Sequence, residues 1–371
     1  LKEGDRFITG EPMTSVGVAD CVKKVARSIG WEGKAEQSLR SGSIVRAKGL
    51  AVAIKSTSTP STSAASVRLN SDGSAILLTS SAEIGQGAHT SLAQIVGDVL
   101  GLPVERVSVT FPDTDVTPYD KSTSSSRTTF HMGRAAEIAA GQIRDQLLQV
   151  GAKALEARVE DLELKDMRLR VRGVPEKTLN FPELFRVIFG EPSGSLFGNH
   201  TLRTEGGVDS KSGQGKGSSF WFYSAAGAEV EVDAETGKIR VLRAVSAVDV
   251  GKAIHPLQCN LQNEGSALAG LGTALFEEMC FDNGQPINCT FLDYLLPSTL
   301  DHPSEFQSLL VETPHPDGPH GAKGMGEAAL PPTAPAIGNA IANALNGARV
   351  RDLPIKPHKV IAALITAKNY G

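Results

Sequence analysis

The sequence predicts an α+β protein with two lobes, each a mixed β-sheet with helices packed on it. Two strand-like hairpins indicate the two lobes: one turns at Asp72-Gly73, the other turns at Thr236-Gly237, and a helix pattern follows each. Between them, residues 191–218 contain Gly, Ser, Lys and Pro and few apolar side chains. That composition is typical of a long loop, so we expect it to join the lobes.

Residues 1–42 are expected to form a helical and extended N-terminal segment. Within it, apolar residues recur at helical spacing from Val16 to Ile29, which predicts an amphipathic helix. The first lobe then spans residues 43–190. Its expected elements are a strand at 43–53, the hairpin at 67–78, a helix capped by Thr90 or Ser91 and ended by Gly101 and Pro103, a strand at 104–111 and a helix at 133–156.

The second lobe spans residues 219–371 and repeats the order of hairpin and helix. Apolar residues alternate on both sides of Thr236-Gly237, which predicts a hairpin over 228–242. The elements expected after it are a helix at 257–276, a strand at 306–312 and closing helices at 335–345 and 358–368. The shared order is a weak sign of an internal repeat.

Composition narrows the class of protein. Of 371 residues, 40% are hydrophobic and 21% charged, which is typical of a folded globular protein. A net charge of −4 gives no reason to expect a nucleic acid partner, and no apolar run is long enough to cross a bilayer. The four cysteines form no C-x-x-C pair, which argues against an iron–sulfur or zinc site in this chain. Scattered thiols favour a reducing compartment, here the cytoplasm.

The chain begins with Leu1, which is neither an initiator methionine nor the start of a signal peptide. We therefore expect a chain that was trimmed, processed or cut from a larger protein.

A first candidate site is Gly85-Gln86-Gly87, directly before a helix pattern. Glycines let the backbone approach a ligand closely, and the free N–H groups of a helix start are donors. Gln86 adds an amide that both donates and accepts. The alternative is a plain turn between a strand and a helix.

A second candidate is the run from Ser122 to Gly133, where five hydroxyl residues, Arg127 and two more hydroxyl residues precede a helix. Hydroxyl groups, a guanidinium and a helix start suit a polyanion such as a pyrophosphate. A flexible Ser-rich linker is the alternative, although Arg127 and the helix that follows argue against it.

A third candidate is the Gly-rich segment from Gly318 to Pro332. Four glycines in nine residues surround Lys323 and place Glu327 at the start of an apolar stretch. An apolar environment disfavours the charged carboxylate and raises its pKa, which is useful in a general base. The alternative is a surface glutamate ahead of the next helix.

In this order and spacing, the three stretches resemble the molybdenum cofactor-binding region of the xanthine dehydrogenase/aldehyde oxidase family. The resemblance covers nearly the whole chain, and Gly321 to Glu327 is its most specific part. Other agreeing segments are Gly4-Asp5, Thr9-Gly10, Leu102-Pro103, Asp113-Thr114-Asp115, Glu231-Val232-Asp233, Asp249-Val250-Gly251, His255-Pro256, Glu264-Gly265, Gly270-Leu271-Gly272, Glu277-Glu278 and Asp293-Tyr294. The chain resembles the C-terminal part of the family's large subunit, with the corresponding α+β fold.

The resemblance implies roles for single residues. Glu327 matches the family's active-site carboxylate, taken to be the base, and Gln86 matches a glutamine beside an oxygen ligand of molybdenum. The positions that match cofactor-binding residues are Gly85, Gln86, Gly87, Ser124, Ser125, Ser126, Arg127, Thr128, Lys323, Gly324 and Gly326. Because dithiolene sulfurs of the pterin hold the metal in this family, no side chain is expected to be a metal ligand.

The implied activity is oxidation of an N-heterocycle of the purine kind or an aldehyde, with water as the oxygen source. Electrons would leave through 2Fe-2S clusters to FAD, both expected on partner chains or domains. Arg127 stands where xanthine-oxidising members have an apolar residue, which favours the cytosine dinucleotide form of molybdopterin. Ala269 stands where such members tend to have a glutamine that contacts the cofactor, which argues against xanthine as substrate.

Two further interpretations stay open. One is a relative that oxidises CO or reduces an aromatic acyl-CoA. The other, of a different class, is a non-catalytic half-site or structural subunit. In each case the expected partners are the N-terminal half of the molybdenum subunit and the iron–sulfur and flavin subunits. Without that half we expect the chain to be inactive and to expose an apolar and Gly-rich face.

Overall fold

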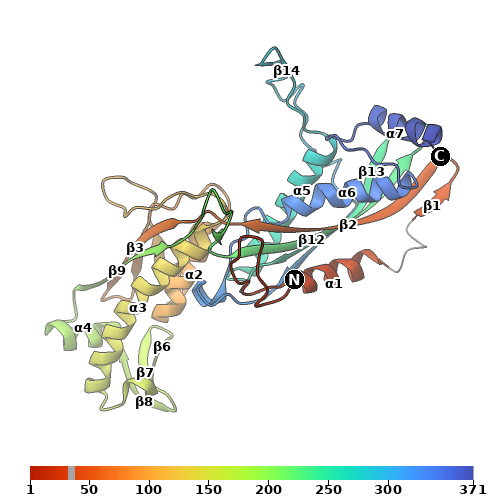
Figure 1. Cartoon of the computed structure of the whole chain (residues 1–371). Helices are drawn as coiled ribbons and strands as arrows, with labels where there is room; N and C mark the ends of the chain where they lie inside the picture. Colours follow the sequence, from red (N-terminus) through yellow and green to blue (C-terminus); the bar gives the residue numbers. More distant parts are fainter. Residues whose placement is uncertain (32–37, 371) are drawn as a thin grey trace.

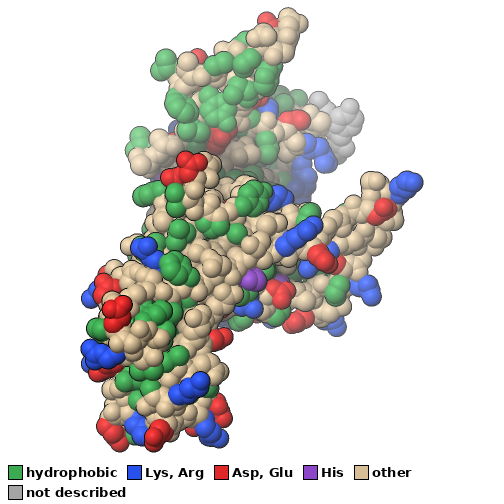
Figure 2. Space-filling view, turned by 90° about the vertical axis from the view of Figure 1, so that its left-hand side faces the viewer, with side chains coloured by type: hydrophobic (Ala, Val, Ile, Leu, Met, Phe, Trp, Pro, Cys, Tyr) green, Lys and Arg blue, Asp and Glu red, His purple; other side chains and the backbone are tan. Residues whose placement is uncertain are grey.

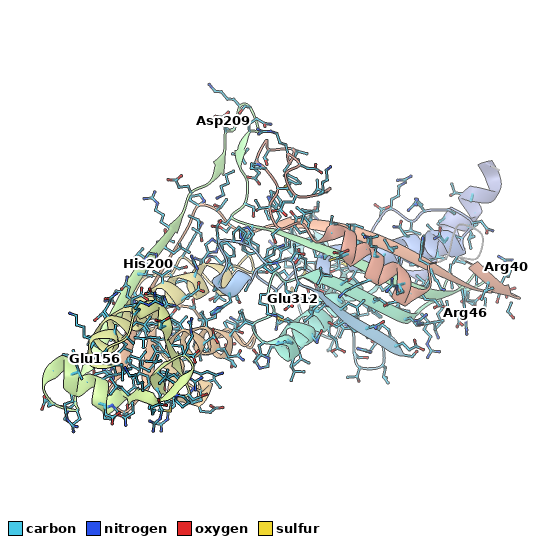
Figure 3. The ribbon with its side chains drawn as sticks, turned by 90° about the horizontal axis from the view of Figure 1, so that it is seen from below. Arg40, Arg46, Glu156, His200, Asp209 and Glu312 are labelled. Carbon is cyan, nitrogen blue, oxygen red and sulfur yellow. The ribbon has the colours of Figure 1, made fainter. Side chains whose placement is uncertain are left out.

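The structure of this chain is a computed structural model that describes residues 1–31 and 38–370. Residues 32–37, part of the expected N-terminal segment, lie outside the described residues. The molecule is elongated, with one sheet and its helices toward each end (Figure 1). Seen from below, Glu156, just beyond the end of α3, and Arg40 in β1 mark the two ends, while Glu312 lies between them (Figure 3).

The larger sheet has five strands in the order β1-β2-β12-β13-β16. The strands are β1 (Ser38–Ser41), β2 (Ile44–Ser56), β12 (Trp221–Asp233), β13 (Ile239–Asp249) and β16 (Glu305–Val311). β12 is antiparallel to both β2 and β13, whereas β16 runs parallel to β13. The predicted hairpin at Thr236-Gly237 is therefore confirmed. Strand β2 was expected in the first lobe, but it pairs with β12 along its whole length.

Helices cover both faces of this sheet. Alternate residues of a strand point to opposite faces: Ala225 of β12 packs under α1 (Val18–Ile29), and its neighbour Ala226 packs under α6 (Leu330–Ala344). Helix α5 (Pro256–Leu275) lies beside α6 and contacts β13 and β16. Close approach depends on small residues, because a Cβ at Gly49 of β2 would lie 2.2 Å from the backbone nitrogen of Ala340.

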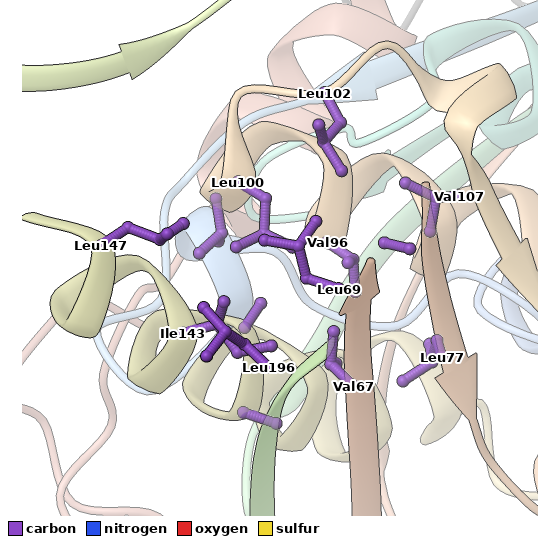
Figure 4. Packing of buried hydrophobic residues seen from close by; sticks show 14 of the residues in the cluster. Val67, Leu69, Leu77, Val96, Leu100, Leu102, Val107, Ile143, Leu147 and Leu196 are labelled. Atoms are coloured by element: carbon purple, nitrogen blue, oxygen red, sulfur yellow. The ribbon is translucent and has the colours of Figure 1, made fainter. Parts of the chain in front are cut away.

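The smaller sheet has four strands in the order β5-β4-β3-β9. The strands are β3 (Ser61–Asn70), β4 (Ala75–Leu78), β5 (Val107–Val109) and β9 (Ser195–Thr204). The turn at Asp72-Gly73 joins β3 to β4 as predicted. Helices α2 (Ala88–Leu100) and α3 (Thr128–Ala154) pack on it. Figure 4 shows Val96 of α2 and Ile143 of α3 in one cluster with Val67, Leu69 and Leu77 of the sheet.

Smaller elements complete the chain. At the far end of α3 lie α4 (Phe181–Phe189) and a three-stranded sheet. Its strands are β6 (Leu162–Lys165), β7 (Arg168–Val171) and β8 (Val174–Asn180). The other elements are η1 (Val104–Arg106), η2 (Val159–Asp161), β10 (Gly207–Val208), β11 (Gly215–Lys216), β14 (Phe281–Asp282), β15 (Gln285–Pro286), η3 (Pro319–Gly321) and α7 (Pro357–Tyr370).

The expected long loop at 191–218 differs from the structure. Ten of its residues form β9, which pairs antiparallel with β3 from Ser195 to Thr204. The strand is polar because every second side chain toward its end is exposed. Gly198 allows it to approach α3, since a Cβ there would lie 1.9 Å from the carbonyl oxygen of Ala139.

Candidate functional site

A cavity of about 240 Å³ lies between the helices of the two sheets. The starts of α2, α3 and α5 and the segment before α6 bound it. The residues that line it are Ile84, Gln86, Ala88, Ser91, Thr123, Ser124, Ser125, Ser126, Thr128, Thr129, His255, Gln258, Cys259, Gln262, Met325, Gly326 and Glu327. The three stretches singled out in the sequence thus meet at one cavity, although they are far apart in the chain.

Gln86 lines the cavity at the start of α2. Its side chain is held locally, because Nε2 donates to the carbonyl of Ala82 at 3.0 Å and Oε1 accepts from the N–H of Ile84 at 2.7 Å. Gly87 precedes the helix with a φ of 76°, a left-handed conformation that favours glycine. The expected cap by Thr90 or Ser91 is wrong, since both lie inside α2.

Glu83 caps α2 instead. Its carboxylate accepts hydrogen bonds from the N–H groups of Gly85, Gly87 and His89 at 2.9–3.0 Å. Partial burial raises the pKa of Glu83, but these three donors lower it more, so that the pKa lies below its ordinary value. Sequence reasoning missed this residue because its partners all lie C-terminal to it, in a turn with no capping pattern.

The Ser-rich stretch reaches the cavity through a tight turn before α3. Ser125 and Ser126 both have a φ of 53°, which is unusual for residues other than glycine. Ser125 is fixed by bonds to a neighbouring segment: its hydroxyl accepts from the N–H of Ser58, and its carbonyl accepts from the hydroxyl of Thr57. Strain held in place at a cavity is typical of a functional turn.

Arg127 does not face the cavity, contrary to expectation. Its side chain is fully buried and pairs with Asp120 at 2.6 Å. It also donates to the hydroxyl of Ser61 and to the carbonyls of Ser122 and Thr62. A buried guanidinium needs partners for all its donors. Arg127 finds them in the interior, and one of them is the carbonyl of Ser122 at the start of the turn.

Lys323 also points into the interior. Its ammonium lies 2.6 Å from Asp249 Oδ2 and donates to the carbonyl of Ser15. Its neighbour Gly324 packs against the Ser-rich turn, where a Cβ would lie 1.8 Å from the carbonyl oxygen of Ser126. Gly326 is slightly freer, with 3.2 Å to Ser126 Oγ. Contact between the two segments therefore requires Gly324 and leaves little room for a side chain at Gly326.

Glu327 lies at the edge of the cavity. Its side chain is 52% exposed, and Oε2 lies 2.9 Å from Lys55 Nζ and accepts from Ser126 Oγ at 3.0 Å. Partial burial raises the pKa of Glu327, but Lys55 and Ser126 lower it more, and the pKa lies below the ordinary value. The expected raised pKa is therefore not observed, because a lysine supplies the opposite charge.

Helix α5 contributes residues that sequence reasoning missed. His255 caps the start of the helix, where its ring accepts from the N–H of Gln258. Gln258, Cys259 and Gln262 follow along the cavity wall. Ala269, expected at a cofactor-contact position, is exposed and does not line the cavity. Gln262, about two turns earlier, provides an amide at the wall. The signal available in the sequence was the spacing of these polar residues, which recur every three or four positions and so share one face of the helix.

The cavity suits a polar, hydrogen-bonding ligand of some size. Gln258 Oε1 is buried and has no hydrogen-bond partner among the described residues, which leaves an acceptor at the wall unsatisfied. Hydroxyl groups of Ser124, Ser126 and Thr128 line the cavity. The N-terminus of α3 also lies there, and the first N–H groups of a helix have no partner within the helix. Within the described residues, no group of three or more His, Cys, Asp or Glu could hold a metal. A metal here would need ligand atoms from its own cofactor.

Among the helices described, none is both long enough and apolar enough to cross a membrane.

Comparison with protein families identifies a cofactor-binding domain. Residues 24–303 match the molybdopterin cofactor-binding domain, which is more than half of the chain. The xanthine dehydrogenase molybdenum-binding subunit of Escherichia coli K12, described as putative, is 29% identical over 97% of this chain and 48% of its own length. The nicotine 6-hydroxylase large subunit of Paenarthrobacter nicotinovorans is 32% identical over 81% of this chain and 36% of its own length.

Solved structures share the fold. Quinoline 2-oxidoreductase from Pseudomonas putida matches with a TM-score of 0.84 and 27% identity, covering 98% of this chain and 47% of that chain. Aldehyde oxidoreductase from Desulfovibrio gigas matches with a TM-score of 0.79 and 25% identity, covering 98% of this chain and 37% of that chain. The chain thus spans less than half the length of the relatives it matches.

Proposed function

The chain belongs to the molybdopterin cofactor-binding domain family, in a molybdenum-binding subunit of the xanthine dehydrogenase/aldehyde oxidase type. We propose that it carries the catalytic base of a molybdenum hydroxylase. The observation that carries the proposal is the meeting of Gln86, Ser126 and Glu327 at one cavity. The substrate class that we favour is an N-heterocycle. Relatives named for nicotine and quinoline support this choice, and an aldehyde is the alternative.

The cofactor would bind against the chain's polar cradle. Hydroxyl groups and backbone N–H groups of Ser124 to Thr128 suit its phosphate end, and the backbone at Gly324 and Gly326 allows close packing. The form that we propose is the cytosine dinucleotide, because its pyrophosphate suits this run of hydroxyls. Arg127 and Lys323 would act from the interior by fixing these segments. When bound, molybdopterin supplies the molybdenum and the redox chemistry.

Glu327 would act as the general base. Its carboxylate is ionised near neutral pH, since its pKa is low, and one of its oxygens is free of partners among the described residues. It would take the proton of the water-derived nucleophile as that oxygen bonds to an electron-poor carbon of the substrate. Gln86, also at the wall, would orient the reacting groups with its amide.

The rest of the subunit would complete the site. Residues 279–300 form an apolar projection, which we call the arm. In our proposal the arm docks onto the rest of the subunit. The arm includes β14 and β15, stands away from the body above α5 (Figure 1) and gathers hydrophobic side chains (Figure 2). Its exposed members are Met279, Phe281, Ile287, Phe291, Leu292, Leu295, Leu296 and Leu300. A patch of this kind marks an interaction site. The relatives are more than twice as long as this chain, and we propose that part of this additional length covers the arm.

Further subunits would carry the 2Fe-2S clusters and FAD that accept the electrons. Two relatives are described as subunits of larger enzymes, one as subunit gamma of a dehydrogenase complex and one as a large subunit, which supports such an assembly. Four free cysteines support a reducing compartment, and we place the complex in the cytoplasm.

The test is to purify the protein with everything that accompanies it from its source, then measure molybdenum, released CMP and turnover. Glu327→Gln should retain molybdenum and CMP but lose at least a hundredfold in kcat, because general base catalysis contributes about 10²–10⁴. A native complex without molybdenum and CMP would contradict the cofactor proposal. Full turnover by Glu327→Gln would contradict the base and favour a structural half-site.

A further inference from the structure

Lys55 is the one cation that contacts Glu327 among the described residues. It lies near the end of β2, where it pairs in register with Phe222 of β12. Its ammonium lies 2.9 Å from Glu327 Oε2 and 4.9 Å from the centre of the Phe222 ring. The side chain is 23% exposed, against 52% for Glu327. Lys55 is therefore anchored on the sheet and is the less exposed member of the pair.

Lys55 and Ser126 hold the same oxygen of the carboxylate. Ser126 Oγ donates to Oε2 at 3.0 Å, and the left-handed turn at Ser126 aims the hydroxyl there. Oε1 has no hydrogen-bond partner among the described residues. One oxygen is thus fixed by two donors, and the other stays available to accept a proton.

Other charged groups near the cavity do not replace Lys55. From α5, His255 and Cys259 line the wall. Behind the Ser-rich turn, Arg127 is neutralised by Asp120, and Lys121 on the outer side donates to Ser58 and Pro60. Among the described residues, Lys55 therefore provides the charge that acts on Glu327, and partial burial opposes it by raising the pKa of Glu327.

We propose that Lys55 is a positioning residue for Glu327: it fixes Oε2 beside Ser126, keeps the carboxylate ionised and leaves Oε1 free to accept a proton. The inference rests on the proposed role of Glu327 as base. It also explains how a half-exposed glutamate can be held in one orientation. Without Lys55, burial would dominate and the carboxylate would take up a proton at a higher pH.

A carboxylate titration of the full chain tests this without the cofactor. In protein labelled with ¹³C at the glutamate carboxyl groups, the NMR signal of Glu327 is the one lost in Glu327→Gln. In Lys55→Gln its titration midpoint should move to higher pH, and in Lys55→Arg it should stay near that of the unaltered chain. Lys48→Gln is the matched control, because Lys48 lies on the same strand and donates to the carbonyl of Gly30.

The assembled enzyme gives the second readout. In Lys55→Gln the acid limb of the kcat profile should move upward in pH by the same amount as the NMR midpoint, while Lys55→Arg restores it. An unmoved Glu327 midpoint in Lys55→Gln would overturn the inference, whatever the cofactor content. An unmoved kcat profile beside a shifted NMR midpoint would instead overturn the base role of Glu327, so the two failures are distinguishable.

Discussion

Lys323 and Asp249 form an ion pair in which Nζ lies 2.6 Å from Oδ2 and neither side chain is accessible to solvent. Asp249 also accepts from the N–H groups of Gly17, Gly251 and Thr313, and Lys323 donates to Ser15. The pair therefore ties the N-terminal segment to the end of β13 and to the segment that leads to the cavity.

Removing one charge of this pair should cost much stability. Lys323→Met leaves Asp249 buried without its partner, so we expect a loss of about 3–5 kcal/mol in the free energy of unfolding. Urea denaturation of the full chain measures it. Lys252→Met is the control: its pair with Glu312 is half exposed and should contribute less than about 1 kcal/mol. Equal losses in the two variants would contradict the structure.

Gly324→Ala should disturb the cavity. The added Cβ would lie 1.8 Å from the carbonyl oxygen of Ser126, so the Ser-rich turn must shift, at roughly 1–3 kcal/mol for an overpacked contact. We expect lower stability and lower molybdenum content after purification. Gly265→Ala in α5 is the control, because nothing lies within 4 Å of its Cβ, and alanine in a helix should gain about 0.5–1 kcal/mol. Equal molybdenum content in both variants would refute the prediction.

Acid should destabilise the fold through His131. Burial, followed by the charge of Arg127, lowers the pKa of this fully buried histidine from 6.5 to about 4. The unfolded chain therefore binds this proton more tightly than the folded chain. The contribution of His131 to the free energy of unfolding is constant above about pH 6.5 and falls as the pH drops toward 4. Between pH 7.5 and pH 5 the loss should be on the order of 2 kcal/mol for one such histidine.

Urea denaturation of His131→Gln at these two pH values measures that share. His315, whose pKa burial also lowers to about 4, should account for a similar part and remain in the variant. A pH dependence identical to that of the unaltered chain would show that His131 is protonated in the folded state.

The arm should matter for assembly but not for folding. Phe291 and Leu300 are 79% and 93% exposed, so serine at either position should change the stability of the chain by less than about 0.5 kcal/mol. Binding of the segment that we propose docks on the arm, titrated by calorimetry, should weaken about fivefold or more, since buried anchors contribute more than about 1 kcal/mol each. Val187→Ser on α4, itself 51% exposed, should leave binding unchanged. Unchanged binding in both arm variants would place the interface elsewhere.

Local signals predicted the elements, and long-range pairing decided where they lie. Helix α1 and the turn at Asp72-Gly73 follow from spacing and turn chemistry, and both are confirmed. Strand β9 could not be read from its polar sequence, because its pairing with β3 and the close contact at Gly198 involve distant residues. β2 was assigned to the first lobe for the same reason: nothing in residues 43–53 indicates β12 as the neighbour.

Some residues of the candidate site could be predicted from motifs, and others only the tertiary fold reveals. Motif residues such as Gln86 and Glu327 do line the cavity. The charges of Arg127 and Lys323 suggested ligand contacts. In the structure both side chains are buried and form ion pairs in the interior instead. Lys55 was not foreseen, because a lysine in a strand usually points to solvent and only the tertiary fold brings it to Glu327.

The smaller sheet buries one hydrophobic cluster and the larger sheet buries one on each face, and a fourth, small cluster around Phe130, Phe220 and Phe222 lies between the two sheets beside the cavity. In such a molecule each sheet and its helices can unfold as a separate cooperative unit, because few contacts connect the two. A ligand in the cavity touches both units, so its binding free energy counts only while both are folded. Calorimetry should therefore show two transitions that merge into one as the cofactor binds, which makes the cofactor a structural cross-link as well as a reagent.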